Sequence, residues 1–175
     1  MIPESQFVEL DKKRHDRNSF NCGTKELNTF IRNFAVRHRE AGISKTMVLP
    51  AKSPKTEKAG ICALYTLSHT QIERKTLPLI LLKKLPRYPV PVLLIAQLAV
   101  YKAAQGQGLG KITLIRALQH CLAINAHLPS YSVVVDALDD GVQGFYEQYG
   151  FQELYRQSGH IRLFLPMKSL IELFS

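Results

Sequence analysis

Residues 105–110, Gln-Gly-Gln-Gly-Leu-Gly, have the residue types and spacing that point most directly to chemistry. Glycine tolerates positive φ, so backbone N–H groups within the segment can turn toward one point. A helix is predicted directly after the glycines, and a helix N-terminus carries a partial positive charge. The loop and the helix together predict a cradle for an anion such as a pyrophosphate.

The loop alone leaves other interpretations open. It lacks the Lys-Ser/Thr ending of P-loop ATPases, because Lys111 is followed by Ile112, and it misses the GxGxxG order of dinucleotide-binding folds. A tight strand-to-helix turn that binds no ligand has the same composition. The surrounding elements therefore decide how far the loop can be interpreted.

Alternating strands and helices surround the loop. Residues 92–100 are nearly all apolar, as expected of a central strand covered on both faces. Residues 111–127 repeat apolar side chains on one helical face. Residues 131–137 are expected to form a parallel neighbour of the central strand, and residues 141–149 a helix closed by Gly150.

The other expected elements complete a mixed α/β sheet with helices on both sides. Thr24 is a candidate helix cap, and Gly42 is expected to end the early helical region. Residues 76–90, which contain a short leucine-rich helix, are interpreted as a mobile, substrate-facing insertion. The remaining strands are expected at 7–10, 44–50, 60–68 and 160–165, and the remaining helices at 24–34, 35–41 and 168–174.

Length and composition predict a single domain covering residues 1–175. The longest apolar stretch, residues 89–96, is far shorter than the roughly 20 residues that span a bilayer. The N-terminus has no secretory pattern, so we expect a cytoplasmic protein without a membrane partner. The three cysteines are widely spaced, which predicts buried thiols and neither a disulfide framework nor a metal site.

The net charge of +9 is concentrated in the first half of the chain. Residues 1–87 contain 17 Lys and Arg against 8 Asp and Glu, whereas residues 88–175 contain six of each kind. Such asymmetry fits a face that meets a polyanion, either a nucleic acid or an anionic cofactor. A solvated basic surface without a partner is the alternative.

Two motifs resemble those of the GNAT superfamily of acyl-CoA-dependent N-acyltransferases. The pattern Gln-x-x-Gly-x-Gly at residues 105–110, after Leu-Ala-Val at 98–100, resembles motif A. The pattern Phe-Tyr-x-x-x-Gly-Phe at residues 145–151 resembles motif B, in the expected order and spacing. The resemblance implies a mostly antiparallel sheet with one splayed parallel strand pair, the strands separating after Val100.

The likeness extends to the GNAT toxins of bacterial type II toxin–antitoxin modules. It is carried by residues 20–23, 27–30, 65–68, 85–91 and 163–168 and covers nearly the whole chain. The chain departs from the family at Gln97, where members often carry Arg. Known members acetylate the α-amine of amino acids on charged tRNA, which stops translation. A ribbon-helix-helix antitoxin usually restrains them, and they are commonly dimers.

The resemblance assigns acetyl-CoA binding to the strand before the loop, the loop, and the start of motif B. Asp139 stands where many members carry an asparagine that contacts the pantetheine arm. The backbones of Leu98 and Val100 are expected to bond that arm and to polarise the thioester. The residues assigned to acetyl-CoA are Leu98, Ala99, Val100, Gln105, Gly106, Gln107, Gly108, Leu109, Gly110, Lys111, Asp139 and Phe145.

The resemblance also implies direct transfer from acetyl-CoA to the amine. Tyr146 is the candidate general acid for the leaving thiolate, since a phenol with a reference pKa of about 10 is a proton donor at working pH. The alternative is that Tyr146 is only a core aromatic. No histidine lies in a recognisable base motif, and His69 and Glu73 are the first to consider.

The early positive charge is interpreted as a tRNA-binding surface, because cations neutralise phosphates. The residues assigned to it are Lys12, Lys13, Arg14, Arg17, Arg32, Arg37, Arg39, Lys83, Lys84 and Arg87. Two alternatives stay open: a GNAT enzyme for a small amine or a protein N-terminus, and a module that binds acetyl-CoA without turnover.

Overall fold

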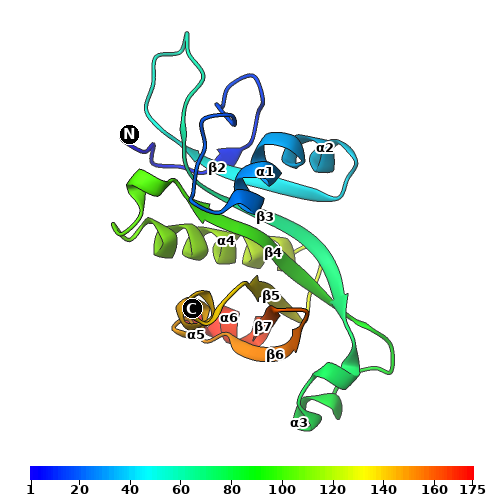
Figure 1. Cartoon of the computed structure of the whole chain (residues 1–175). Coiled ribbons are helices and arrows are strands. Elements are labelled where there is room, and N and C mark those ends of the chain that lie inside the picture. Colours follow the sequence, from blue (N-terminus) through cyan, green and yellow to red (C-terminus); the bar gives the residue numbers. More distant parts are fainter. The chain divides into compact units, whose positions relative to one another are not determined.

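The structure is a computed structural model that describes residues 1–175, with seven strands and six α-helices (Figure 1). The strands are β1 (Val8–Glu9), β2 (Ser44–Pro50), β3 (Ile61–Ile72), β4 (Val90–Val100), β5 (Ser132–Ala137), β6 (Gln152–Gln157) and β7 (His160–Pro166). The α-helices are α1 (Lys25–Asn33), α2 (Ala35–Glu40), α3 (Leu79–Leu82), α4 (Leu109–Asn125), α5 (Asp140–Glu147) and α6 (Met167–Leu173). Two 3-10 turns are η1 (Arg74–Thr76) and η2 (Lys102–Ala104).

The strands follow the order β1-β2-β3-β4-β5-β7-β6 in one sheet. Antiparallel ladders join β1 to β2, β2 to β3, β5 to β7 and β7 to β6. The pair β4 and β5 is parallel, with Leu93 opposite Val133 and Ile95 opposite Val135. This confirms the predicted mixed, mostly antiparallel sheet with one parallel pair.

The chain forms two compact units, which are described one at a time. The first contains Met1–Ser68 and Ala96–Ala117, and the second contains His69–Ile95 and Leu118–Ser175. The elements β3, β4 and α4 contribute residues to both units. A single domain over residues 1–175 stays a prediction.

In the first unit, helices cover both faces of the strands. On one face, α1 and α2 bury residues such as Ile31 against Val48 and Leu64. On the other face, Leu109 at the start of α4 packs against a cluster that includes Leu49 and Ala63. Val48 pairs with Leu64, and Leu49 with Ala63. Because neighbouring residues of a strand point to opposite faces, the Val48–Leu64 pair faces one helical layer and the Leu49–Ala63 pair faces the other.

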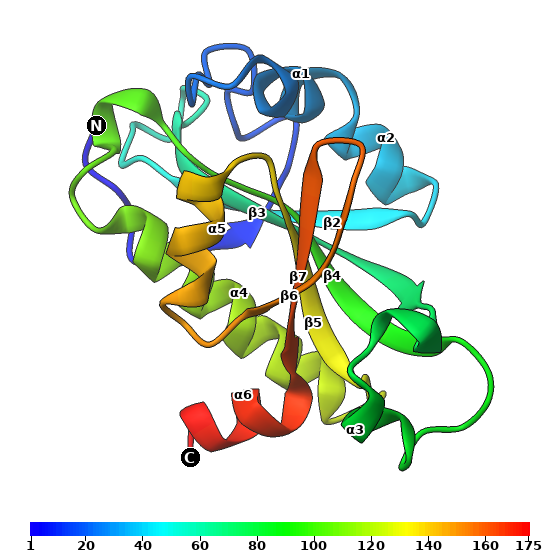
Figure 2. The same ribbon diagram turned by 60° about the horizontal axis from the view of Figure 1, so that its bottom comes forward.

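In the second unit, an apolar cluster joins the strands to the α3 segment. Val92, Val134 and Phe164 of three strands pack with Leu77, and Leu81 and Leu82 of α3 border the same cluster. Figure 2 shows the β6–β7 hairpin and α6, which follows β7 directly. The helices α5 and α6 both contact β5 and β7. The expected short leucine-rich helix is therefore present, and its substrate-facing role stays a prediction.

Three local features differ from the sequence expectation. The strand β6 was not predicted, because its residues are polar and mostly exposed. It closes a hairpin through Ser158 and Gly159, which both have positive φ. The strand β3 runs four residues beyond the expected Ser68, to Ile72. Thr24 occupies the N-cap position of α1 but makes no side-chain capping hydrogen bond.

The three cysteines are free and buried, which confirms their prediction as core thiols. Burial raises the pKa of Cys121 to about 12 and also raises the pKa of Cys62, so both favour the protonated, unreactive form. No three His, Cys, Asp or Glu side chains group in a way that could hold a metal ion. No helix combines the length and apolarity needed to cross a membrane.

Candidate active site

The glycine loop is open to solvent and strongly turned. Gly106 and Gly108 have φ of +78° and +82°, and a Cβ added to either would meet nothing within 4 Å. Residues 105–108 are exposed. Gly110, which the sequence placed in the same turn, lies instead in the first turn of α4. Two glycines, and not three, therefore supply the positive φ that turns the loop.

The start of α4 directs unpaired backbone donors at the end of this loop. The Gly108 carbonyl accepts from the Ile112 N–H at 3.3 Å, which marks Gly108 as the residue just before the helix. The first N–H groups of a helix have no partner within it. They and the helix dipole favour an anion here. Lys111, in the first turn, is exposed and adds a full positive charge.

Gln105 holds the loop in place, which its position in the motif did not reveal. Its Nε2 donates to the Val100 carbonyl at 2.9 Å and to the Cys22 carbonyl at 2.8 Å. The Lys102 N–H donates to Asn21 in the same region. The loop is thus tied both to the end of β4 and to the segment before α1. The side-chain amide nitrogen of Gln105 thus stabilises the conformation of the glycine loop.

The predicted residues of β4 lie directly before the loop. Ala99 is 5% exposed and packs in the cluster that contains Ile31 of α1, whereas Val100 borders the cluster that contains Leu49. Leu98 and Val100 are half-buried. Successive side chains of β4 therefore pack on opposite faces of the sheet. This segment would bind a pantetheine arm through its backbone N–H and C=O groups.

Tyr146 is almost fully buried in the second unit, with 6% of the residue exposed. Its ring packs edge-on against Phe145 and Phe151, with centroids 5.3 and 5.5 Å away. Burial, and then the negative charge of Asp136, raise the pKa of Tyr146 well above that of a free phenol. The phenol therefore stays protonated across the working pH range, as a proton donor must.

Two other residues assigned to acetyl-CoA, one just before motif B and one at its start, have structural contacts. Asp139 caps α5, because its Oδ1 accepts from the Val142 N–H at 2.9 Å. Phe145 forms edge contacts with Tyr146 and Tyr149. An aspartate makes an N-cap as good as asparagine. The departure from the family's asparagine therefore leaves the start of this helix intact.

An ion pair within electrostatic reach of Tyr146 was not predicted from the sequence. Arg162 donates from Nε and Nη2 to the two carboxylate oxygens of Asp136, each at 2.8 Å. The hydrogen bond to Asp136 raises the pKa of Arg162 above that of a free guanidinium. The sequence feature that could have indicated this pair is one charged residue, Asp136 or Arg162, inside each of two mostly apolar segments, residues 132–137 and 160–166.

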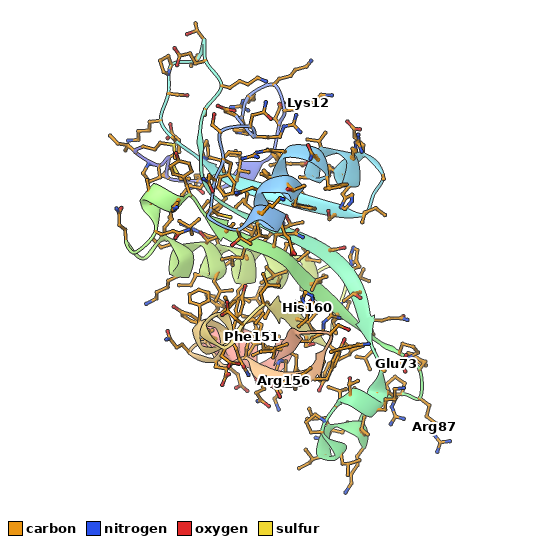
Figure 3. All side chains as sticks on the ribbon, viewed as in Figure 1. Lys12, Glu73, Arg87, Phe151, Arg156 and His160 are labelled. Carbon is orange, nitrogen blue, oxygen red and sulfur yellow. The ribbon has the colours of Figure 1, made fainter.

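The ten basic residues assigned to tRNA divide between the two units, seven in the first and three in the second. Nine are exposed and Arg17 is half-buried. Figure 3 shows Lys12 in the loop after β1 and Arg87 in the segment after α3. Arg39 is already paired with Glu9 at 2.8 Å, so part of its charge is neutralised.

A cavity of about 470 Å³ lies in the first unit between β1, β2 and α2. Lys12, Arg14 and Arg39 line it together with the acids Glu9, Asp11 and Glu40. None of the residues assigned to acetyl-CoA lines it. Its wall carries three basic and three acidic side chains, so it shows no excess of positive charge for an anion.

The two unassigned candidates for a base are both exposed. Glu73 lies at the turn before η1, where its carbonyl accepts from Thr76, and Figure 3 shows it near the start of the α3 segment. His69 lies near the end of β3. Neither is within the aromatic cluster around Tyr146.

Residues 57–151, which include the glycine loop and Tyr146, match the acetyltransferase (GNAT) family. The chain belongs to this family. The match covers more than half of the 175 residues, and it identifies the protein as an acetyltransferase. The GNAT motifs recognised in the sequence are therefore those of the family itself.

Individual GNAT relatives resemble the chain over most of its length. A tRNA-acetylating toxin of Mycobacterium tuberculosis is 27% identical over 137 residues, 78% of both chains. The solved structure of AtaT complexed with acetyl-methionyl-tRNAfMet has a TM-score of 0.86 and 27% identity, covering 97% of this chain and 99% of that one. The structure of AtaTR bound with AcCoA has a TM-score of 0.82 and 27% identity, covering 97% and 98%.

Proposed function

We propose that this GNAT enzyme is a toxin that transfers the acetyl group of acetyl-CoA to the α-amine of the amino acid on charged tRNA. An acetylated amine cannot attack the next peptidyl ester, so translation stops. The main support is the likeness over 97% of the chain to AtaT complexed with acetyl-methionyl-tRNA. The likeness to a tRNA-acetylating toxin supports the same substrate.

The glycine loop fits the pyrophosphate of acetyl-CoA. Gly106 and Gly108 leave open space beside their backbone, and the first turn of α4 supplies N–H donors and Lys111. Such a cradle binds a doubly charged group by several charge-assisted hydrogen bonds. Gln105 contributes by holding the loop to Val100 and Cys22.

Tyr146 would act when the thioester is cleaved. The amine nitrogen forms a bond to the acetyl carbon, the carbon–sulfur bond breaks, and the thiolate takes the phenolic proton. The nitrogen releases one proton to solvent, and the phenol regains one from solvent. Because burial and Asp136 raise the pKa of Tyr146, the donor is present at every pH at which the amine is reactive.

The acceptor amine needs little help to become neutral. A free α-amine has a pKa of about 7.7–8.0, and an adjacent ester withdraws electrons and lowers it. Much of an aminoacyl amine is therefore neutral near pH 7. A dedicated base is less necessary for this acceptor than for a lysine side chain, which is consistent with the exposed positions of His69 and Glu73.

The loop after β1 provides a direct prediction for tRNA binding. Changing Lys12, Lys13 and Arg14 together to alanine should raise the KM for charged tRNA by about tenfold, because exposed cations contribute affinity through phosphates. The slope of log affinity against log salt should become shallower by about 0.7–0.9 for each phosphate that is no longer neutralised. Steady-state kinetics at several salt concentrations measure both effects.

The hairpin loop between β2 and β3 supplies the matched control. Lys52, Lys55 and Lys58 are equally exposed and lie in the same unit, yet they are not assigned to tRNA. Changing these three lysines to alanine removes the same charge and should leave the KM nearly unchanged. Equal kinetics of both triple variants would instead support a merely solvated surface and a small-amine acceptor.

Two partners belong to the same proposal. The toxin assignment implies a ribbon-helix-helix antitoxin and a homodimer, since toxins of this kind commonly have both. Light scattering on the purified chain measures the mass in solution, and a value near twice 19.8 kDa is expected. Co-expression with a small ribbon-helix-helix protein from the adjacent gene should yield a stable complex with reduced toxicity. We also propose that the protein acts in the cytoplasm, where charged tRNA is found.

Transfer of labelled acetyl groups tests the substrate. Purified chain is incubated with labelled acetyl-CoA and total tRNA that is either charged or deacylated. Label should enter the charged tRNA only, and mild alkaline hydrolysis of the aminoacyl ester should release it. Label on deacylated tRNA, or none on either, would reject the α-amine of charged tRNA as the acceptor.

A further inference from the structure

Asp136 interrupts a strand that is otherwise buried. It is the one exposed residue of β5. Its cross-strand neighbour on β7 is Arg162, a second charge among mostly buried residues. Charges inside a sheet lose part of their water, and their attraction often fails to compensate for that loss. A function other than stability is therefore expected of the pair.

The pair holds its carboxylate in a fixed orientation. Both oxygens of Asp136 accept from Arg162 at 2.8 Å, the two-point geometry that gives a carboxylate one preferred plane. The guanidinium in turn lies over the ring of Tyr155, 6.0 Å from its centroid. The Arg162 side chain is 18% exposed, so this support is mostly buried.

The carboxylate of Asp136 retains the capacity to bind a ligand. A carboxylate offers about four acceptor positions, and Arg162 uses one on each oxygen. The side chain of Asp136 is 35% exposed, so a donor from outside can reach it. The complementary ligand is an N–H group that carries or develops positive charge, which is the chemistry of a primary amine.

Asp136 also lies close to the proposed acid. The strand β5 passes through Leu138 and Asp139 directly into α5, the helix that carries Tyr146. That helix packs against β5 and β7, the two strands that carry the ion pair. Burial, and then the negative charge of Asp136, raise the pKa of the Tyr146 phenol, so the two side chains are within electrostatic reach of each other. A negative group and a proton donor thus lie within electrostatic reach of each other in one unit.

We propose that the carboxylate of Asp136 binds the α-amine of the acceptor and that Arg162 is the positioning residue that orients this carboxylate. The inference rests on the proposed function and adds the amine subsite to it. The carboxylate accepts one N–H of the neutral amine, which directs the nitrogen lone pair. When the nitrogen–carbon bond forms, the nitrogen becomes positively charged, and Asp136 stabilises that charge. The nitrogen then releases its proton to solvent.

Asp136→Asn tests the subsite, because it removes the charge and keeps the shape. Two acceptors are used with acetyl-CoA: total charged tRNA, and methionine methyl ester as a small primary α-amine. For each acceptor, kcat/KM should fall about tenfold or more, the typical effect of losing a hydrogen bond to a charged group. The KM for acetyl-CoA should stay unchanged.

The pH profile separates this role from a structural one. A carboxylate favours the ammonium form of a bound amine, so the amine in the wild-type complex titrates at higher pH. The acid limb of kcat should therefore move to lower pH in Asp136→Asn. Arg162 from β7 pairs with Asp136, Tyr155 from β6 contacts Arg162, and Tyr146 from α5 is affected by the Asp136 charge; none of these three is a carboxyl or imidazole group.

Two further variants serve as controls. Arg162→Lys keeps a positive charge but loses the two-point fork, so an intermediate fall in kcat/KM for the amine is expected. Glu153→Gln removes a carboxylate from the Arg156 pair on β6, where the Nε–Oε1 distance is 2.9 Å, and should leave the kinetics unchanged. Arg162→Lys also keeps the test decisive if Asp136→Asn fails to fold.

The outcomes distinguish the amine subsite from the proposed function. If the wild type acetylates charged tRNA and the Asp136 and Arg162 variants keep its kcat/KM and acid limb, the subsite is wrong and the function stands. If the wild type acetylates only methionine methyl ester, tRNA acetylation is wrong, and the ester kinetics still decide the subsite. If neither amine is acetylated, both are wrong.

Discussion

Tyr146→Phe is expected to lower kcat for acetyl transfer by about 100-fold or more, within the range of general acid catalysis. The change removes only the phenolic hydroxyl, so the departing thiolate loses its proton donor. The ring remains to fill its place between Phe145 and Phe151. The affinity for acetyl-CoA and the free energy of unfolding should therefore stay close to those of the wild type. Transfer kinetics, calorimetry and thermal melting measure these quantities.

Tyr149→Phe is the matched control for that result. Tyr149 lies three residues further along the chain, is half-buried and also contacts Phe145, yet it has no assigned role. Its variant should keep wild-type kcat. In cells, Tyr146→Phe should relieve growth arrest and Tyr149→Phe should not. Undiminished kcat in Tyr146→Phe would mean that the thiolate leaves without an acid and that Tyr146 is only a core aromatic.

Substitution of the loop glycines should have the second large effect. Gly106→Ala and Gly108→Ala should each raise the dissociation constant of acetyl-CoA by about tenfold or more, as expected when one or two charge-assisted hydrogen bonds are lost. The new methyl group would occupy the open space beside the turned backbone, where we place the pyrophosphate. Calorimetric titration with acetyl-CoA measures the change.

Gly42→Ala separates loss of the cradle from simple backbone strain. Gly42 has φ of +75°, nearly that of Gly106, and an added Cβ there also meets nothing within 4 Å. All three alanine variants should lose about 1–2 kcal/mol of unfolding free energy, because alanine disfavours positive φ. Only the loop variants should lose acetyl-CoA affinity. Equal, unchanged affinity in all three would place the pyrophosphate elsewhere.

Elements with a clear apolar periodicity, or with clear turn residues at their ends, were predicted correctly from the sequence. The apolar run of β4, the helix after the loop and the parallel partner β5 are all present. The polar, exposed strand β6 was missed, because it has neither an apolar run nor clear alternation. Its turn at Ser158 and Gly159 becomes recognisable only when a strand is already expected on both sides.

The residues of the candidate site that belong to a sequence motif could be predicted. Those whose role depends on tertiary contacts could not. Gly106, Gly108 and Tyr146 follow from motif order and spacing. The support that Gln105 gives to the loop depends on Cys22, 83 residues earlier in the chain. The pairing of Asp136 with Arg162 depends on the register of two strands 26 residues apart. Neither interaction leaves a local pattern in the sequence.

The chemical identity of the product tests the central claim most directly. Charged tRNA is incubated with the purified chain and acetyl-CoA, and the 3′-terminal nucleoside is then released by nuclease and analysed by mass spectrometry. We predict N-acetyl-aminoacyl adenosine, heavier than the untreated aminoacyl adenosine by the mass that one acetyl group adds, and an initial rate of its formation about 100-fold lower when Tyr146→Phe replaces the wild type. Unmodified aminoacyl adenosine, under conditions in which the same protein binds acetyl-CoA, would contradict the claim that charged tRNA is the acceptor.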